Sequence, residues 1–74
     1  MSVTVLDVKG LNCPLPILRA KKAIKDVVAG ATLQVLATDP GSVKDFEAFC
    51  RQTGNELSSW GEESGVYTFN IKKG

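Results

Sequence analysis

The stretch VTVLDVKGLNCPLPIL, residues 3–18, changes from a strand pattern to a helix pattern within a few positions. Residues 3–8 are mostly β-branched and apolar, which is typical of a β-strand. Residues 9–12 predict a short loop. Pro14 and Pro16 then favour the first turn of a helix, where proline removes no helical hydrogen bond. Cys13 therefore falls at the junction between a strand and a helix.

This first helix and the strand after it follow from hydrophobic periodicity. Apolar residues recur at helical spacing at Ile17, Ala20, Ile24, Val27 and Val28. Gly30 is expected to end the helix. After it, apolar residues alternate with polar ones at Leu33, Val35 and Ala37, which predicts a half-buried strand.

The second half of the chain predicts another helix and two more strands. Residues 39–42, Asp-Pro-Gly-Ser, favour a turn in which either Asp39 caps the helix or Ser42 does so together with Asp45. The apolar stripe of this helix consists of Val43, Phe46, Phe49 and Cys50, and it stops at Gly54. Residues 55–62 and 66–72 predict strands joined by a turn at 63–65.

These elements predict an α/β (α+β) fold. The order is strand, helix, strand, helix, strand, strand. The first two strands should be parallel, joined by a right-handed crossover, and the last two should form an antiparallel hairpin. Two short helices can cover only one face of a four-stranded mixed sheet, so we expect a two-layer sandwich. We expect the 74 residues to form a single domain, residues 1–74.

The charge and the apolar content of the sequence limit the classes of function that it can have. Nine Lys and Arg against eight Asp and Glu give a net charge of +1, so the overall charge does not favour direct binding of nucleic acid. The sequence contains no apolar run of about 18 residues, and its start lacks the pattern of a signal peptide. We therefore expect a cytoplasmic protein that is not embedded in a membrane.

The candidate reactive groups are the two cysteines, Cys13 and Cys50. The chain has no histidine, which excludes a Cys–His pair or a Ser–His–Asp triad within it. Two cysteines are too few ligands for a metal site, so we expect no metal and no cofactor. Cys50 lies on the apolar stripe and is expected to be buried. The alternative, a resolving cysteine that meets Cys13 in space, stays open.

Cys13 is the candidate catalytic residue. With Cys13 as the N-cap, Pro14, Leu15, Pro16 and Ile17 shape the first turn, and the N–H groups of Leu15 and Ile17 can point toward the sulfur. The N-terminus of a helix lowers the pKa of a thiol. We therefore expect Cys13 to be partly ionised at neutral pH and nucleophilic.

A lone activated thiol favours carrying a group over exchanging disulfides. Pro16 occupies the position of the second cysteine in a Cys-x-x-Cys motif, so no local thiol can resolve a mixed disulfide. Such a thiol can hold a disulfide partner, a metal ion or a sulfane sulfur as a persulfide. From the residues alone, the alternative is equally open: Cys13 has a structural role in a non-catalytic binding or regulatory module.

The pattern Asp7-x-x-Gly10-Leu11-x-Cys13-Pro14-x-Pro16 resembles the signature of the TusA-like (SirA-like) sulfur-carrier family. The likeness covers nearly the whole chain and continues through Gly30, Asp39-Pro40, Phe49-Cys50 and the end Lys72-Lys73-Gly74. It implies a sulfur relay of the sulfurtransferase type that acts stoichiometrically. Cys13 would accept sulfane sulfur as a persulfide and pass it to an acceptor thiol, with Pro14 and Pro16 shaping its turn.

The resemblance also implies partners. The sulfur donor would be a cysteine desulfurase or a rhodanese-like protein, and the acceptor another protein thiol. In thiosulfate utilisation the family works beside a membrane transporter of sulfur compounds. Other routes lead to tRNA thiolation, molybdenum cofactor assembly and sulfur oxidation, and the motif does not choose among them. The basic residues of the first helix, Arg19, Lys21, Lys22 and Lys25, form either a solvated face or a docking surface for an acidic partner.

Overall fold

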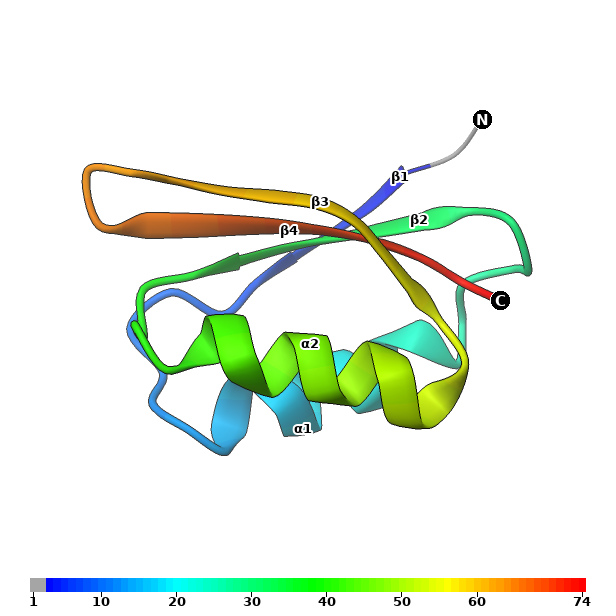
Figure 1. The fold of residues 1–74 in the computed structure, drawn as a ribbon, viewed down its shortest axis with the longest axis horizontal. Coiled ribbons are helices and arrows are strands. Elements are labelled where there is room, and N and C mark those ends of the chain that lie inside the picture. Colours follow the sequence, from blue (N-terminus) through cyan, green and yellow to red (C-terminus); the bar gives the residue numbers. More distant parts are fainter. Residues whose placement is uncertain (1–2) are drawn as a thin grey trace.

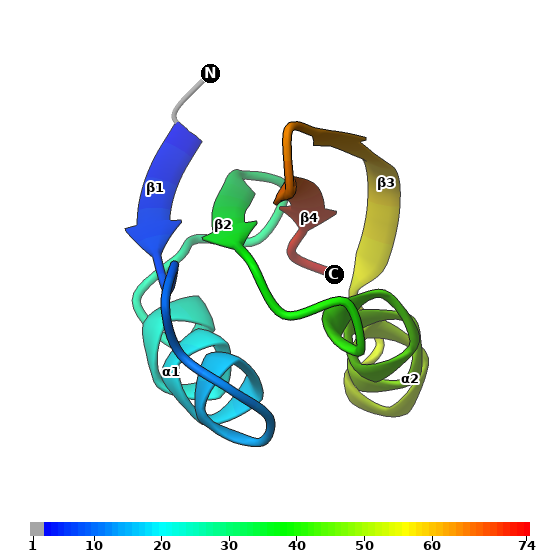
Figure 2. The same cartoon turned by 90° about the vertical axis from the view of Figure 1, so that its left-hand side faces the viewer.

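The structure, a computed structural model, describes residues 3–74, so Met1 and Ser2 of the expected domain range lie outside it. Its elements are β1 (Val3–Asp7), α1 (Leu15–Ile24), β2 (Thr32–Ala37), α2 (Ser42–Thr53), β3 (Glu56–Glu63) and β4 (Val66–Lys72). The four strands form one sheet in the order β1-β2-β4-β3, and both helices lie on the same face of it (Figures 1 and 2). The predicted element order and the two-layer sandwich are confirmed.

The sheet is mixed, as predicted. β1 pairs with β2 in parallel, whereas β4 pairs antiparallel with both β2 and β3. Because β1 and β2 run in the same direction, their carboxyl ends lie at the same edge of the sheet. The connections that follow them, residues 8–14 and 38–41, meet at this edge (Figure 1).

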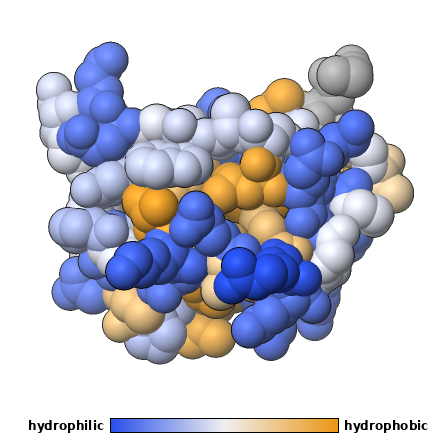
Figure 3. Space-filling model, in the orientation of Figure 1, coloured by the Kyte–Doolittle hydropathy of each residue, from blue (hydrophilic) through white to orange (hydrophobic). Residues whose placement is uncertain are grey.

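The hydrophobic core lies between the sheet and the helices. Leu33, Val35 and Ala37 of β2 are all buried, which confirms the alternation seen in the sequence. The ring of Phe46 from α2 stacks on that of Phe69 from β4, with 4.7 Å between the ring centroids. On the face shown in Figure 3, apolar side chains are visible in the middle, between hydrophilic ones.

The first helix is shorter than predicted. It begins at Leu15 and ends at Ile24, and turns follow it up to Gly30. Val27 still reaches the core, but Val28 is 69% exposed. The prediction that Val28 belongs to the buried stripe is therefore wrong, because the helical period of 3.6 residues no longer applies after the helix ends.

The start of α2 also differs from the prediction. Gly41 is the N-cap, and no side chain caps the helix. The cap by Asp39 and the reciprocal pair of Ser42 and Asp45 are therefore both absent from this helix start. The other end is as predicted: Gly54 follows the helix with a φ of 74°, a left-handed conformation that glycine adopts without strain.

Replacement of the buried Leu33 should destabilise the fold strongly. Leu33→Ala removes apolar contacts at the centre of the core, so we expect a loss of about 2–5 kcal/mol in the free energy of unfolding. Leu18→Ala is the matched control, because Leu18 is 54% exposed and its loss should change stability by less than about 0.5 kcal/mol. Urea denaturation of the three proteins measures both values. Similar losses in the two variants would contradict this placement of the core.

Candidate functional site

The two cysteines have opposite environments. Cys13 is exposed in the connection between β1 and α1, whereas Cys50 is buried in α2. Both thiols are free. The expected burial of Cys50 is confirmed, and burial raises its pKa to about 11. Cys13 is therefore the accessible thiol of the pair.

The loop that carries Cys13 is held by its backbone against the segment that follows β2. The N–H of Val8 donates to the carbonyl oxygen of Leu36 (2.8 Å), and the N–H of Gly10 donates to Oγ1 of Thr38 (2.9 Å). These bonds continue the contact between β1 and β2 beyond the ends of the strands. They fix the path of the chain toward Cys13 without using the thiol.

Asp39 completes this attachment. Its Oδ2 accepts a hydrogen bond from the N–H of Cys13 (2.8 Å), and its Oδ1 accepts one from the N–H of Gly41 (3.1 Å). One carboxylate thus joins the cysteine loop to the start of α2. Sequence analysis assigned Asp39 to helix capping and missed this role. The available signal was the parallel pairing of β1 and β2, which brings the segments after them together.

The expected cap geometry around Cys13 is wrong. Pro14, not Cys13, is the N-cap of α1, and the N–H of Leu15 donates to the carbonyl oxygen of Asn12 (2.8 Å). That N–H is therefore not available to the sulfur. Pro16 is the second residue of the helix and is buried. The peptide bond between Cys13 and Pro14 is cis.

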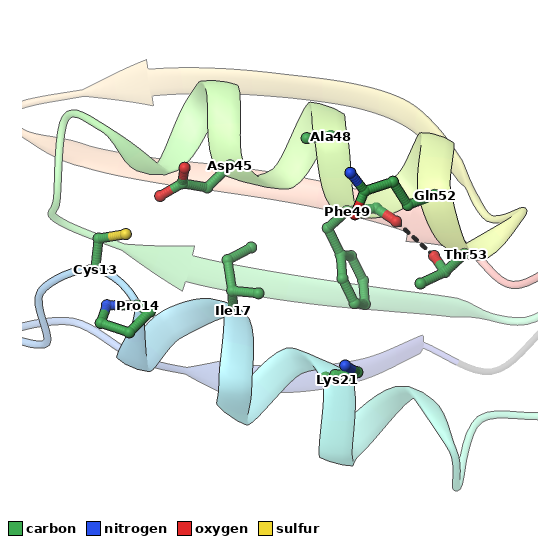
Figure 4. A pocket seen from close by; sticks show the side chains of 9 residues that line it. All are labelled: Cys13, Pro14, Ile17, Lys21, Asp45, Ala48, Phe49, Gln52 and Thr53. Atoms are coloured by element: carbon green, nitrogen blue, oxygen red, sulfur yellow. Dashed lines mark hydrogen bonds between the residues drawn. The ribbon is translucent and has the colours of Figure 1, made fainter.

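A groove of about 270 Å³ runs between α1 and α2 and begins at Cys13 (Figure 4). Its walls consist of Cys13, Pro14, Ile17 and Lys21 on one side and Asp45, Ala48, Phe49, Gln52 and Thr53 on the other. The structure therefore places Pro14 and Ile17 beside Cys13. Of the other two predicted shaping residues, Leu15 is exposed on α1 and Pro16 packs into the interior.

Two carboxylates control the electrostatics of Cys13. The side chain of Asp45 is the main cause that raises the pKa of the Cys13 thiol above its ordinary value. Desolvation and the negative charges of Asp45 and Asp39 act in the same direction. The predicted lowering of this pKa is therefore wrong: both acidic residues come from the part of the chain after β2, which the local sequence around Cys13 does not reveal.

Two further findings concern residues 3–74 only. No group of three or more His, Cys, Asp or Glu side chains in this range is arranged to hold a metal ion. No helix in the same range is long and apolar enough to cross a membrane.

Fold and site together define a class: a small α/β sandwich that presents one accessible thiol at the open end of a groove. Comparison with known proteins identifies the family within this class. The family described as "Sulfurtransferase TusA" matches residues 4–73. The chain therefore belongs to the TusA family of sulfur carriers, and the family expected from the Cys-Pro-x-Pro motif is confirmed.

Individual relatives agree with this assignment. The chain is 63% identical to the sulfur carrier protein TusA of Allochromatium vinosum over 68 residues, which cover 92% of this chain and 90% of the relative. It is 43% identical to TusA of Pseudomonas entomophila, covering 92% and 85% of the two chains. The solved structure of a SirA-like protein from Desulfitobacterium hafniense has a TM-score of 0.82 and 28% identity, and it covers 99% of both chains.

The bridge made by Asp39 can be tested by Asp39→Asn. An amide has one acceptor oxygen, so one of the two N–H groups that the carboxylate binds loses its partner. We expect a loss of about 1–2 kcal/mol in the free energy of unfolding, because these bonds are made to a charged group. Faster hydrogen exchange of the Cys13 amide should accompany it. Asp26→Asn, at an exposed carboxylate in the turns after α1, is the control; an equal loss there would contradict the bridge.

The different burial of the cysteines predicts selective alkylation. Native protein treated with iodoacetamide at pH 7.5 (about 1 unit below an ordinary thiol pKa) should gain a single adduct, on Cys13. Cys50 should react only after unfolding, because it is buried and its pKa is about 11. Intact mass and peptide mapping give the number and position of adducts. Two adducts on folded protein would contradict the burial of Cys50.

Proposed function

We propose that Cys13 is the sulfur-bearing residue of this carrier: it accepts sulfane sulfur as a persulfide from a donor protein and passes it to an acceptor thiol. The observation that carries this proposal is the position of Cys13. It is the exposed cysteine of the two, it belongs to the Cys-Pro-x-Pro motif of a TusA family member, and it lies at the open end of a groove.

The way in which the loop is held favours this role over a purely structural one. The hydrogen bonds that attach the loop use the backbone N–H groups of Val8, Gly10 and Cys13. The thiol contributes to none of them. A serine at this position would keep the same backbone bonds, so the fold gives no reason for a thiol, whereas sulfur chemistry does.

Loading is a nucleophilic displacement at sulfur. The Cys13 thiolate attacks the outer sulfur of a donor persulfide, R–S–SH. A bond forms between Sγ of Cys13 and the outer sulfur, while the sulfur–sulfur bond of the donor breaks. The electron pair leaves with the inner sulfur of the donor as a thiolate, which takes up the proton that Cys13 released. No oxidant or reductant is consumed.

Unloading is the same displacement in the opposite sense. The thiolate of an acceptor attacks the outer sulfur of Cys13–S–SH, and Cys13 leaves as a thiolate. Each partner must bring its own cysteine to Sγ, and the exposure of Cys13 fits that need. Pro14 and Ile17 form the groove wall beside the transferred sulfur, Pro16 anchors the turn in the interior, and Leu15 stays exposed next to the site.

The partners we assign to this relay are a donor that forms a protein persulfide, of the cysteine desulfurase or rhodanese type, and an acceptor protein with a free cysteine. We assign the relay to the cytoplasm, because a thiol carrier needs a compartment in which thiols stay reduced. The exposed Lys22 of α1 and Lys25, directly after this helix, suit an acidic partner, since opposite charge speeds encounter.

Intact mass after incubation with a sulfane-sulfur donor tests the proposal. Wild type should gain one sulfur atom that a reductant removes. Cys13→Ser should gain none, and Cys50→Ser, the matched cysteine variant, should gain one as wild type does. If folded wild type forms no adduct, or if the adduct remains in Cys13→Ser, Cys13 is not the sulfur-bearing residue and the binding module becomes the better description.

A further inference from the structure

The helix dipole favours an acidic side chain at the position of Asp45, but it does not require that this side chain face Cys13 across the groove. Asp45 lies in the first turn of α2 and is half-buried, but it does not cap the helix. The single ion pair found within residues 3–74 joins Lys9 and Asp7, so Asp45 is not part of one. A half-buried carboxylate without a cap or an ion pair stabilises the fold only through the helix dipole, an interaction that any acidic residue in this turn would make.

The geometry of the groove gives Asp45 a different function. Its side chain and that of Cys13 line the same end of the groove and point toward one another from opposite walls (Figure 4). A thiol beside a carboxylate keeps its proton, because ionisation would place two negative charges side by side. The thiolate, not the thiol, is the nucleophile. Asp45 therefore opposes the reaction that Cys13 has to perform.

We propose that Asp45 holds Cys13 of the free carrier as a neutral thiol, and that a partner activates Cys13 by placing a positive charge, from a Lys or Arg next to its own cysteine, beside the Asp45 carboxylate. A cation at this point cancels the field of the carboxylate, so Cys13 can release its proton to solvent and attack. Asp45 thus acts through Cys13: it sets the protonation of the thiol and selects partners that bring a positive charge. This inference rests on the proposed function of Cys13.

The other charged groups around Cys13 do not replace this partner charge. Asp39, from the connection before α2, adds a second negative charge and acts in the same direction as Asp45. Lys21 of α1 lines the groove but forms no ion pair with Asp45 among the described residues. Lys9, in the loop of Cys13, pairs with Asp7 at 3.8 Å. No described cation is therefore paired with Asp45, and in the proposal the compensating charge comes from the partner.

The first experiment measures the rate of alkylation of Cys13 by iodoacetamide against pH. In Asp45→Asn the midpoint of the profile should move to lower pH than in wild type. The rate at pH 7 should rise about threefold per unit of that shift, because the thiolate fraction grows tenfold while the intrinsic nucleophilicity falls. Glu47→Gln is the control, since it removes the same charge from an exposed position on α2 outside the groove. Coinciding profiles of Asp45→Asn and wild type would overturn the proposal.

The second experiment tests the selection of positive charge. Mixed-disulfide formation at Cys13 is timed with cystamine, which carries two ammonium groups, and with dithiodiglycolate, which carries two carboxylates. Wild type and Glu47→Gln should prefer cystamine, and the ratio of the two rates should be at least about threefold smaller in Asp45→Asn. High salt should reduce the preference of wild type as well, a measurement that needs no variant. An equal ratio in wild type and Asp45→Asn would overturn the proposal.

Neither experiment involves sulfane sulfur. If both experiments fail, the proposed role of Cys13 as the sulfur-bearing residue still stands. Failure of wild type to load sulfur would show instead in the mass experiment above, whatever the alkylation profiles are.

Discussion

The parallel pairing of β1 with β2 is the constraint on which the functional end of the molecule depends. Parallel strands have their carboxyl ends at one edge, so the segments that leave them must share that edge. Cys13 follows β1, whereas Asp39 and Asp45 follow β2. Backbone N–H groups of the first segment donate hydrogen bonds to side chains of the second, those of Thr38 and Asp39. An antiparallel pairing of the same strands would send the cysteine and the carboxylates to opposite ends of the sheet.

The acidic surroundings of Cys13 suit a carrier better than they would suit a free-standing catalyst. A carrier has to keep its sulfur between two encounters. The better a thiolate is stabilised, the more readily it leaves a persulfide or disulfide. A raised pKa makes Cys13 a poorer leaving group, so under the proposed function the persulfide would be retained until an acceptor docks. In that proposal, the carboxylates that keep the empty thiol protonated would also slow the loss of sulfur from the loaded one.

The two-layer architecture gives the two thiols different exposure to solvent. The core lies between the helices and the covered face of the sheet, and Cys50 is one of its buried residues. Its thiol is thereby kept from the surface. Of the two free thiols, only that of Cys13 is accessible to a partner, which fits the role proposed for it.

The sequence by itself determined the elements, their order, the two-layer fold and the choice of Cys13, because periodicity, turn residues and the Cys-Pro-x-Pro motif are local patterns. Only the tertiary structure decided in which direction the pKa of that thiol is shifted. The N–H of Cys13 is bound by a carboxylate 26 positions further along the chain, and Asp45 approaches from another helix. Local capping rules therefore predicted a lowered pKa, whereas the field at Sγ depends on which distant charges the fold brings within a few ångströms.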